Sequence, residues 1–193
     1  MMNSKERILN TLNKVSRDAL PRPEIELQYP PEVLVEDFVR IAEASGTEVF
    51  LATPDTVADT VRKWSRGGDI QSCVPGLQDE FPLIFDEQIP FDREKMPEVF
   101  VAEAAFGVIE NAALWLTDSE LRARLLAFIP ERIVVLLKAG SLVSTMHQAY
   151  AIIAENDPFG FGLFMAGASK TADIEQTLVK GAQGAKELAV ILY

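Results

Sequence analysis

Apolar residues in this chain follow two different spacings, and the spacing separates expected helices from expected strands. In several segments they recur every three or four positions, which is typical of a helix with one buried face. One such segment is residues 32–45, and another follows Thr53, which caps a helix that Pro54 begins. Shorter helices are expected after Ser119, which caps the first of them, and over a segment that contains Val143, Met146, Tyr150 and Ile153.

Other segments are short and predict strands, and one of them, residues 133–137, is a continuous apolar run typical of a strand buried on both faces. They are residues 47–51, 69–74, 83–85, 99–101, 112–116, 133–137, 161–165 and 188–192. Helices and strands alternate along the first half of the chain. This order predicts an α/β fold, in which a mostly parallel sheet is flanked by helices.

Prolines separate the N-terminal part of the chain from this pattern. Residues 1–20 predict a helix that Ser4 caps, with Ile8, Leu12 and Val15 on one face. Residues 21–31 contain four prolines and predict an extended connector. Residues 32–193 then form one α/β domain. We expect the first helix to dock on this domain rather than on a neighbouring subunit.

The charge balance narrows the range of partners. The chain has 18 Lys and Arg against 29 Asp and Glu, which gives a net charge of −11. Nucleic acids and anionic membranes bind clustered cations, so neither is expected as a partner, whereas a small anionic ligand held by one lysine is compatible with this charge. The sequence shows no apolar run of roughly 18 residues and no signal-peptide pattern, so we expect a cytoplasmic protein without membrane insertion.

Cysteine and histidine each occur once, which limits the chemistry. Cys73 alone cannot form an internal disulfide, a zinc-finger site or an iron–sulfur site, and its surroundings predict a buried, inert thiol. His147 is expected on the exposed face of a helix, so a Ser–His or Cys–His mechanism has little support. With one histidine and scattered acids, no metal site is expected.

The loop after the penultimate apolar run carries the densest chemistry. Gly167 permits close backbone approach, Ser169 and Thr171 offer hydroxyls, Lys170 is a cation and Asp173 a carboxylate. Because α/β proteins bind ligands where strands end, these residues are the predicted ligand-binding site. A structural interpretation competes with it: Ser169 or Thr171 caps a helix with Asp173 in its first turn, and Lys170 is solvated or pairs with Asp173.

Three segments of the C-terminal half resemble a known family. They are residues 106–114, residues 126–135 and residues 167–175, whose Gly-Ala-Ser-Lys-Thr-Ala-Asp-Ile-Glu is similar to the family signature Gly-Pro-Ser-x-Thr-Ala-Asp-Ile-Glu. On these motifs the chain resembles the LUD-domain family and, within it, the lactate-utilisation protein C group. Residues 6–9 are also similar to the start of that group.

The resemblance implies a fold of the sugar-phosphate isomerase and CoA-transferase type, with residues 32–193 as a LUD-type domain. It implies a role in the oxidation of L-lactate to pyruvate beside two iron–sulfur partner proteins, which hold the clusters while this chain holds no cofactor. In the related CoA-transferases a glutamate attacks the thioester, which makes Glu110 a candidate catalytic residue. Alternatively, Glu110 accepts from backbone amides at a strand end, and Glu103 is a second acid with the same two interpretations.

Two positions depart from the family pattern. Ala112 and Ala113 replace a Gly-Thr pair, which adds a methyl group that hinders a positive φ and removes a hydroxyl. Arg132 stands where a histidine is usual. These departures leave two other functions open: an independent enzyme acting on a CoA thioester, a sugar phosphate or a folate, and a family member that has lost catalysis.

Overall fold

The computed structural model describes residues 3–14, 21, 23, 31–85, 95–155, 160–174 and 177–193. The helices are α1 (Ser4–Asn13), α2 (Pro31–Ala44), α3 (Val57–Trp64), α4 (Asp118–Leu121) and α5 (Met146–Glu155), with short 3-10 helices η1 (Pro54–Thr56), η3 (Arg124–Ala127) and η4 (Ala139–Ser141). The strands are β1 (Glu48–Leu51), β2 (Ile70–Ser72), β3 (Val99–Glu103), β4 (Phe106–Val108), β5 (Ala113–Thr117), β6 (Arg132–Leu137), β7 (Leu142–Val143), β8 (Gly162–Met165), β9 (Lys170–Ile174), β10 (Thr177–Lys180) and β11 (Glu187–Leu192). Val15 and most of the expected connector lie outside the described residues.

A parallel sheet forms the centre of the domain, as the alternation of elements predicts. Its strand order is β1-β11-β6-β3-β2, and every neighbouring pair in it runs parallel. The central strand β6 is buried along its whole length because its apolar run faces a hydrophobic layer on both sides. Ile133 and Val135 belong to the core on one face, and Val134 and Leu136 to the core on the other.

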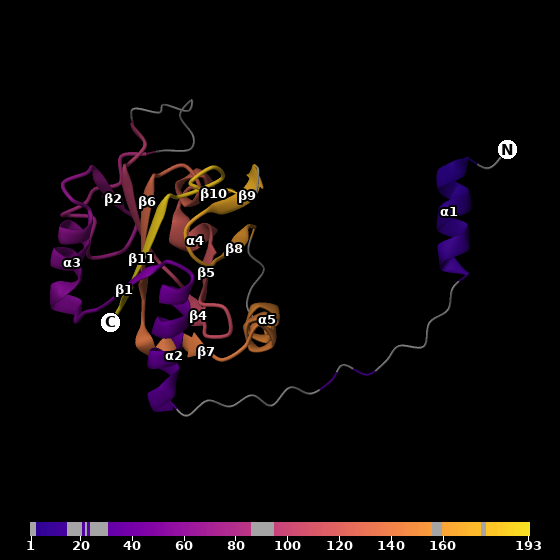
Figure 1. The fold of residues 1–193 in the computed structure, drawn as a ribbon, viewed down its shortest axis with the longest axis horizontal. Helices are drawn as coiled ribbons and strands as arrows, with labels where there is room; N and C mark the ends of the chain where they lie inside the picture. The colour runs from indigo at the N-terminus through magenta and orange to yellow at the C-terminus, as the bar shows by residue number, and fades with distance from the viewer. Residues whose placement is uncertain are drawn as a thin grey trace.

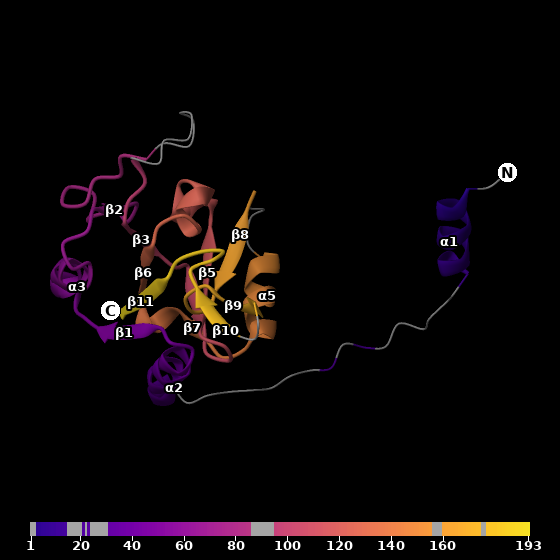
Figure 2. The same cartoon turned by 45° about the horizontal axis from the view of Figure 1, so that its top comes forward.

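Helices cover both faces of this sheet (Figures 1 and 2). On one face α3 buries the three residues that the helical spacing places together, Val57, Val61 and Trp64. On the other face α2 buries Phe38 and Ala42. The helices and their inward faces are therefore confirmed for this half of the chain.

A second sheet packs beside α2 on the same face, and the sequence pattern did not predict it. Its order is β7-β4-β5-β8, with antiparallel pairing on both sides of β5. Gly107 in β4 lies where this sheet meets the first: a Cβ there would lie 2.7 Å from Leu137 Cδ2. The outer face of the second sheet packs against α5, around Ala149, Trp115 and Phe164.

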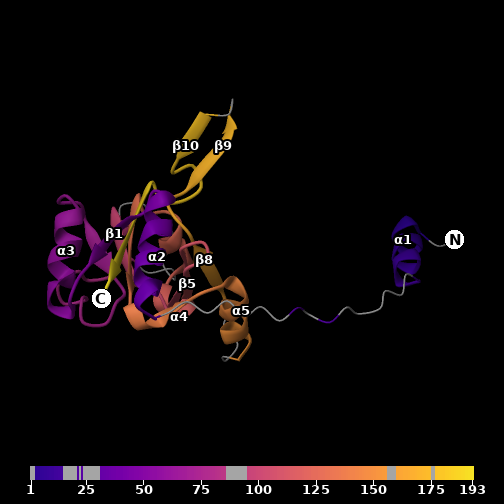
Figure 3. The ribbon, with the colours of Figure 1, turned by 60° about the horizontal axis from the view of Figure 1, so that its bottom comes forward.

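The signature segment forms a hairpin. Strands β9 and β10 pair antiparallel, with Thr171 opposite Val179, and project from the body of the domain (Figure 3). Leu178 near the tip is 59% exposed. The interpretation of Ser169 or Thr171 as a helix cap is therefore wrong, because the chain continues from Ser169 into a strand.

Three local expectations are also wrong. Residues 83–85 form no strand, because the N–H groups of Ile84 and Phe85 donate to the side-chain oxygen of Gln71 instead of to a neighbouring strand. The helix expected after Ser119 is capped by Thr117. It ends at Arg122, whose φ of +62° separates α4 from η3.

The third wrong expectation concerns the helix around Met146. It begins at Met146 itself, and Val143 belongs to strand β7. Tyr150, expected on its buried face, is 57% exposed.

Helix α1 lies apart from the α/β domain (Figure 1). Asn3, one residue before the expected Ser4, caps it through a reciprocal pair of hydrogen bonds with Glu6. None of its residues is buried, and Ile8 and Leu12 are each 61% exposed, so the expected docking on the domain is not seen. No helix in the described ranges combines the length and apolarity needed to cross a bilayer.

Candidate functional site

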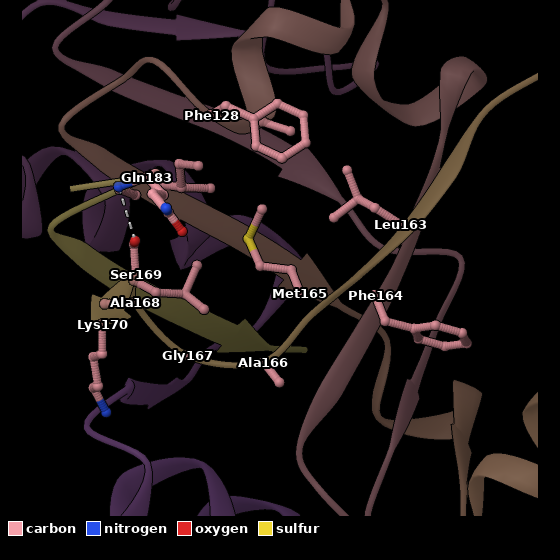
Figure 4. Close-up of a pocket in the computed structure, with 15 residues that line it drawn as sticks. Phe128, Leu163, Phe164, Met165, Ala166, Gly167, Ala168, Ser169, Lys170 and Gln183 are labelled. Carbon is pink, nitrogen blue, oxygen red and sulfur yellow. Dashed lines mark hydrogen bonds between the residues drawn. The ribbon is translucent and has the colours of Figure 1, made fainter. Parts of the chain in front are cut away.

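The loop between β8 and β9 lines a cavity of about 440 Å³, shown in Figure 4, which we call the signature-loop cavity. Its apolar lining comes mainly from β8 and from the first residues of β6 and β11. Its lining residues include Phe128, Ile133, Leu163, Met165 and Leu188 together with Ser169, Lys170 and Gln183. An apolar cavity with a few polar groups is the usual form of a small-molecule site.

Gly167 gives the loop its shape, as the sequence predicts. Its φ is +82°, a conformation that residues with a Cβ rarely adopt. A Cβ at this position would also lie 3.2 Å from the hydroxyl and 3.4 Å from the carbonyl oxygen of Ser45. The close backbone approach is therefore made to the end of α2.

Ser169 ties the signature loop to the turn before β11. Its N–H donates to the carbonyl of Ala185 at 2.9 Å, and its own carbonyl accepts from Gly181 at 3.0 Å. Its hydroxyl oxygen accepts from the N–H of Gln183 at 3.3 Å (Figure 4). A serine hydroxyl that accepts one hydrogen bond can still donate its own proton.

Lys170 lines the cavity but directs its ammonium group away from it (Figure 4). The side chain is exposed, and Nζ donates to the carbonyl of Ser45 just after α2. A cation at this end of a helix interacts favourably with the unpaired carbonyls and the helix dipole. In this arrangement Lys170 stabilises the contact between the hairpin and α2, and an anion in the cavity would need a different lysine rotamer.

The other two predicted ligand-binding residues lie farther along the hairpin. Thr171 is in β9, opposite Val179, and is not among the residues that line the cavity. The side chain of Asp173 lies outside what the structure describes. The fold thus brings Gly167, Ser169 and Lys170 together at one cavity, and not Thr171.

Glu110 lies in the turn between β4 and β5, outside the signature-loop cavity. It is exposed, and its Oε2 accepts from the N–H of Met146 at 2.8 Å, at the first residue of α5. A carboxylate at a helix N-terminus satisfies an unpaired N–H and interacts favourably with the helix dipole. The geometry therefore corresponds to the structural interpretation of Glu110, as an acceptor for a backbone amide.

The residues that depart from the family pattern occupy well-defined places. Ala112 is buried with a φ of +53°, so the turn keeps a left-handed conformation without glycine. Arg132, at the start of β6, is 7% exposed. It donates to the carbonyl of Ser65 at 2.6 Å and pairs with Glu98, which gives it a structural role.

The remaining candidates lie apart from the cavity. His147 is exposed on α5, as predicted. Cys73 is buried, as predicted, and burial raises the pKa of its thiol to about 12. Glu103 ends β3 and accepts hydrogen bonds from Lys138 and Tyr193.

Sequence reasoning missed most of the apolar lining of the cavity. Leu163 and Met165 face it from alternate positions of β8, whereas the ring of Phe164 packs on Trp115 with centroids 4.5 Å apart. This alternation is a signal for a strand with two different environments. Phe128 and Gln183 carry no comparable signal, because they enter from segments distant in the sequence.

Comparisons with known proteins agree with this fold. The LUD domain matches residues 97–193. An uncharacterized protein of Neisseria meningitidis serogroup B is 26% identical over 219 residues, covering 98% of this chain and 93% of that protein. A crystal structure of a DUF162 family protein from Deinococcus radiodurans superposes with a TM-score of 0.62 at 13% identity, covering 86% of this chain and 99% of that one. This last likeness concerns the fold.

Proposed function

Because the chain belongs to the LUD-domain family, we propose that it is a component of L-lactate oxidation to pyruvate and that it works with iron–sulfur partner proteins. The match of the LUD domain over residues 97–193 is the observation that carries this proposal, since it spans the signature loop and its cavity. The finer assignment, to the lactate-utilisation protein C group, is part of the proposal and rests on the signature residues 167–175.

Two features support an action through partners. The chain has a single cysteine, so it cannot supply the set of thiolates that holds an iron–sulfur cluster, and the clusters belong on other chains. Helix α1 exposes Ile8, Leu9 and Leu12. A helix this short is marginal alone in water, so a partner surface that buries these residues would stabilise it.

The test is growth on L-lactate of a strain that lacks only this protein. We expect growth and lactate oxidation to be lost while growth on pyruvate continues, because only the oxidation step is removed. A plasmid copy of the full chain should restore both. Unchanged growth on lactate in the deletion strain would refute the proposal.

The signature-loop cavity favours a second candidate, an independent enzyme acting on a CoA thioester, a sugar phosphate or a folate. A bound ligand at about 100 times its dissociation constant adds about 2.7 kcal/mol to stability, a shift of roughly 5–10 °C in the melting temperature. If this candidate is correct, one of these ligands raises the melting temperature and Ser169→Ala reduces the shift. No shift with any of them would leave the partner role favoured.

A third candidate, a family member without catalysis, is addressed by Ala112. Because the turn already holds a φ of +53°, its backbone shape alone does not mark the site as lost. Restoring the family pair with Ala112→Gly and Ala113→Thr tests the missing hydroxyl. Ligand binding that appears only in the restored variant would support lost catalysis.

A further inference from the structure

Helix α1 has one apolar side that nothing in its own domain covers. Ile8 and Leu12 are four residues apart and Leu9 is three residues before Leu12, so the three side chains form one stripe along the helix, with Lys5 beside it. All three apolar side chains are exposed. Because α1 has only 10 residues, it gains stability when another surface buries this stripe.

The distribution of charge indicates what kind of surface this is. Residues 1–20 contain four Lys and Arg against two Asp and Glu, a net charge of +2. Residues 21–193 contain 14 Lys and Arg against 27 Asp and Glu, a net charge of −13. An anionic membrane would attract the helix but repel the domain attached to it, whereas the acidic domain of a second copy attracts the helix. The charges therefore favour a second copy of this chain over a membrane.

The domain exposes a pair of large apolar residues at the amino end of its parallel sheet. Phe128 and Ile129 are 43% and 46% exposed and lie between η3 and β6. Ile129 lines a cavity of about 620 Å³, which we call the amino-end groove. The rest of its lining includes the apolar residues Met96, Pro97 and Pro130 and the acidic residues Glu98 and Glu131.

The two acidic residues of the amino-end groove are accessible to a further cation. The side chains of Glu98 and Glu131 are 49% and 59% exposed, and they pair with Arg132 and Lys186. A carboxylate has two oxygens and accepts more than one donor, so each can also accept from a lysine. The groove thus combines apolar and acidic groups, as α1 combines an apolar stripe with Lys5. An amphipathic helix that lays its apolar face in such a groove is a recurrent form of recognition.

We propose that α1 of one copy binds the amino-end groove of a second copy, so that two copies exchange their N-terminal helices. Helix α1 lies apart from its own domain (Figure 1), which is the arrangement that an exchanged helix requires. One contact of this kind is small, but a symmetric exchange makes it twice. The two basic helices also offset part of the repulsion between two acidic domains. The exchange does not depend on a role in lactate oxidation.

The first experiment measures the mass of the purified full chain by size-exclusion chromatography with light scattering, up to about 100 μM. We expect a dimer. Ile8→Asn alters the helix and Ile129→Asn alters the groove, and each should weaken the dimer about tenfold or more. Lys5→Glu should weaken it too, because a carboxylate then faces the acidic groups of the groove. Leu51→Asn is the matched control, since Leu51 is an exposed apolar residue at the other end of the sheet, and it should leave the dimer unchanged.

The second experiment tests whether the helix crosses between copies. The Ile8→Asn chain keeps its groove and the Ile129→Asn chain keeps its helix, so one intact contact forms only when the two variants are mixed. We expect a 1:1 complex in the mixture at a concentration at which neither variant dimerises alone. Circular dichroism confirms that each variant is folded. Amide hydrogen exchange of residues 126–133, slower in the unmodified chain than in Ile8→Asn, locates the groove without a groove variant.

Four results would overturn the proposal. The first is a monomer at every concentration. The second is a dimer that Ile8→Asn does not weaken, which would place the interface elsewhere. The third is no complex in the mixture, which would place α1 on its own domain. The fourth is α1-dependent binding to phosphatidylglycerol vesicles without a dimer, which would make the helix a membrane anchor. Lactate growth of the deletion strain tests the role in lactate oxidation separately, so the two ideas can fail independently.

Discussion

The two ends of the parallel sheet differ in how their residues come together. At the amino end, the signature-loop cavity contacts β6 and β11 near their first residues through Ile133 and Leu188, and eight of its fifteen lining residues come from the continuous segment 163–170. At the carboxyl end, Glu103, Lys138 and Tyr193 come from three strands. The signature-loop cavity is mainly apolar and its polar contacts are mostly with the backbone, whereas the group at the carboxyl end is joined through charged and hydroxyl side chains.

This difference shows what a motif in a single sequence does and does not indicate. The signature predicted a ligand site at the end of a strand, but that strand, β8, belongs to the second sheet. The cavity therefore lies at the opposite end of the parallel strands from the usual ligand edge. A contiguous motif can indicate residues that connect parts of the fold as readily as a ligand site. Here Ser169 connects the loop to the turn before β11, and Lys170 connects the hairpin to the end of α2.

The largest expected effect concerns Cys73 at the carboxyl end. Its pKa of about 12, against 9.0 for an ordinary thiol, results mainly from burial. At pH 8 the folded chain should react with an alkylating reagent about a thousandfold more slowly than the chain in urea, because the thiolate reacts and little is present. Mass spectrometry of timed samples measures both rates. Fast alkylation of the folded chain would show that the carboxyl end opens in solution.

The next effect tests the amino end. Replacing Arg132 by Met removes its hydrogen bond to the Ser65 carbonyl and its ion pair with Glu98. We expect the free energy of unfolding to fall by about 2 kcal/mol, as measured in urea. Arg40→Met, which removes an exposed arginine, should change it by less than about 0.5 kcal/mol. An equal fall in the free energy of unfolding for both variants would mean that the buried contacts of Arg132 contribute no more stability than an exposed arginine.

A smaller effect concerns the turn at Ala112, which belongs to neither end. Ala112→Gly relieves a φ of +53° but removes a buried methyl group, so stability should be unchanged or rise by up to about 1 kcal/mol. Ala102→Gly, an equally buried alanine in β3, should lower it by about 1 kcal/mol or more. Urea unfolding of both variants compares them. A loss as large at Ala112 as at Ala102 would contradict the strain argument.

The smallest effect is acid sensitivity at Glu103. Its pKa is lower in the folded chain than in the unfolded chain, so its contribution is present above about pH 4.3 and is lost as the pH falls through the folded value. Between pH 7 and pH 3, Glu103→Gln should lose less stability than the unmodified chain. The difference should be about 0.2–1 kcal/mol, since the pair with Lys138 is partly solvated. A greater loss of stability in Glu103→Gln than in the unmodified chain would contradict a lowered pKa of Glu103 in the folded chain.

The spacing of apolar residues predicted the parallel sheet and its two covering helices, because in those segments the apolar side chains are the buried ones. Residues 133–137 are apolar and buried on both faces, and Val57, Val61 and Trp64 share one helix face. The second sheet was not predicted because β4 and β7 have only three and two residues, and because β7 pairs in parallel with β4, which is distant in the sequence. Residues 83–85 looked like a strand, but one glutamine side chain, Gln71, takes their backbone donors.

The candidate site was predictable only in part. Gly167 was identified because a tight loop often needs a positive φ, which glycine adopts without strain. The direction of the Lys170 side chain was not predictable, because it depends on Ser45, which follows α2 and lies close to Lys170 only in the folded chain. The group around Glu103 needs the strand order of the sheet, which no local spacing contains.

The pairing of β1 with β11 has a consequence for synthesis on the ribosome. β1 is an edge strand whose only neighbour in the sheet, over the described residues, is β11, with Glu48 opposite Ala189. The backbone groups of β1 that pair with β11 therefore stay unpaired until β11 has left the exit tunnel. During that delay an extended apolar segment is available to chaperones and to other nascent chains. The order of translation, rather than the strength of any one contact, then determines when β1 is paired and no longer open to aggregation.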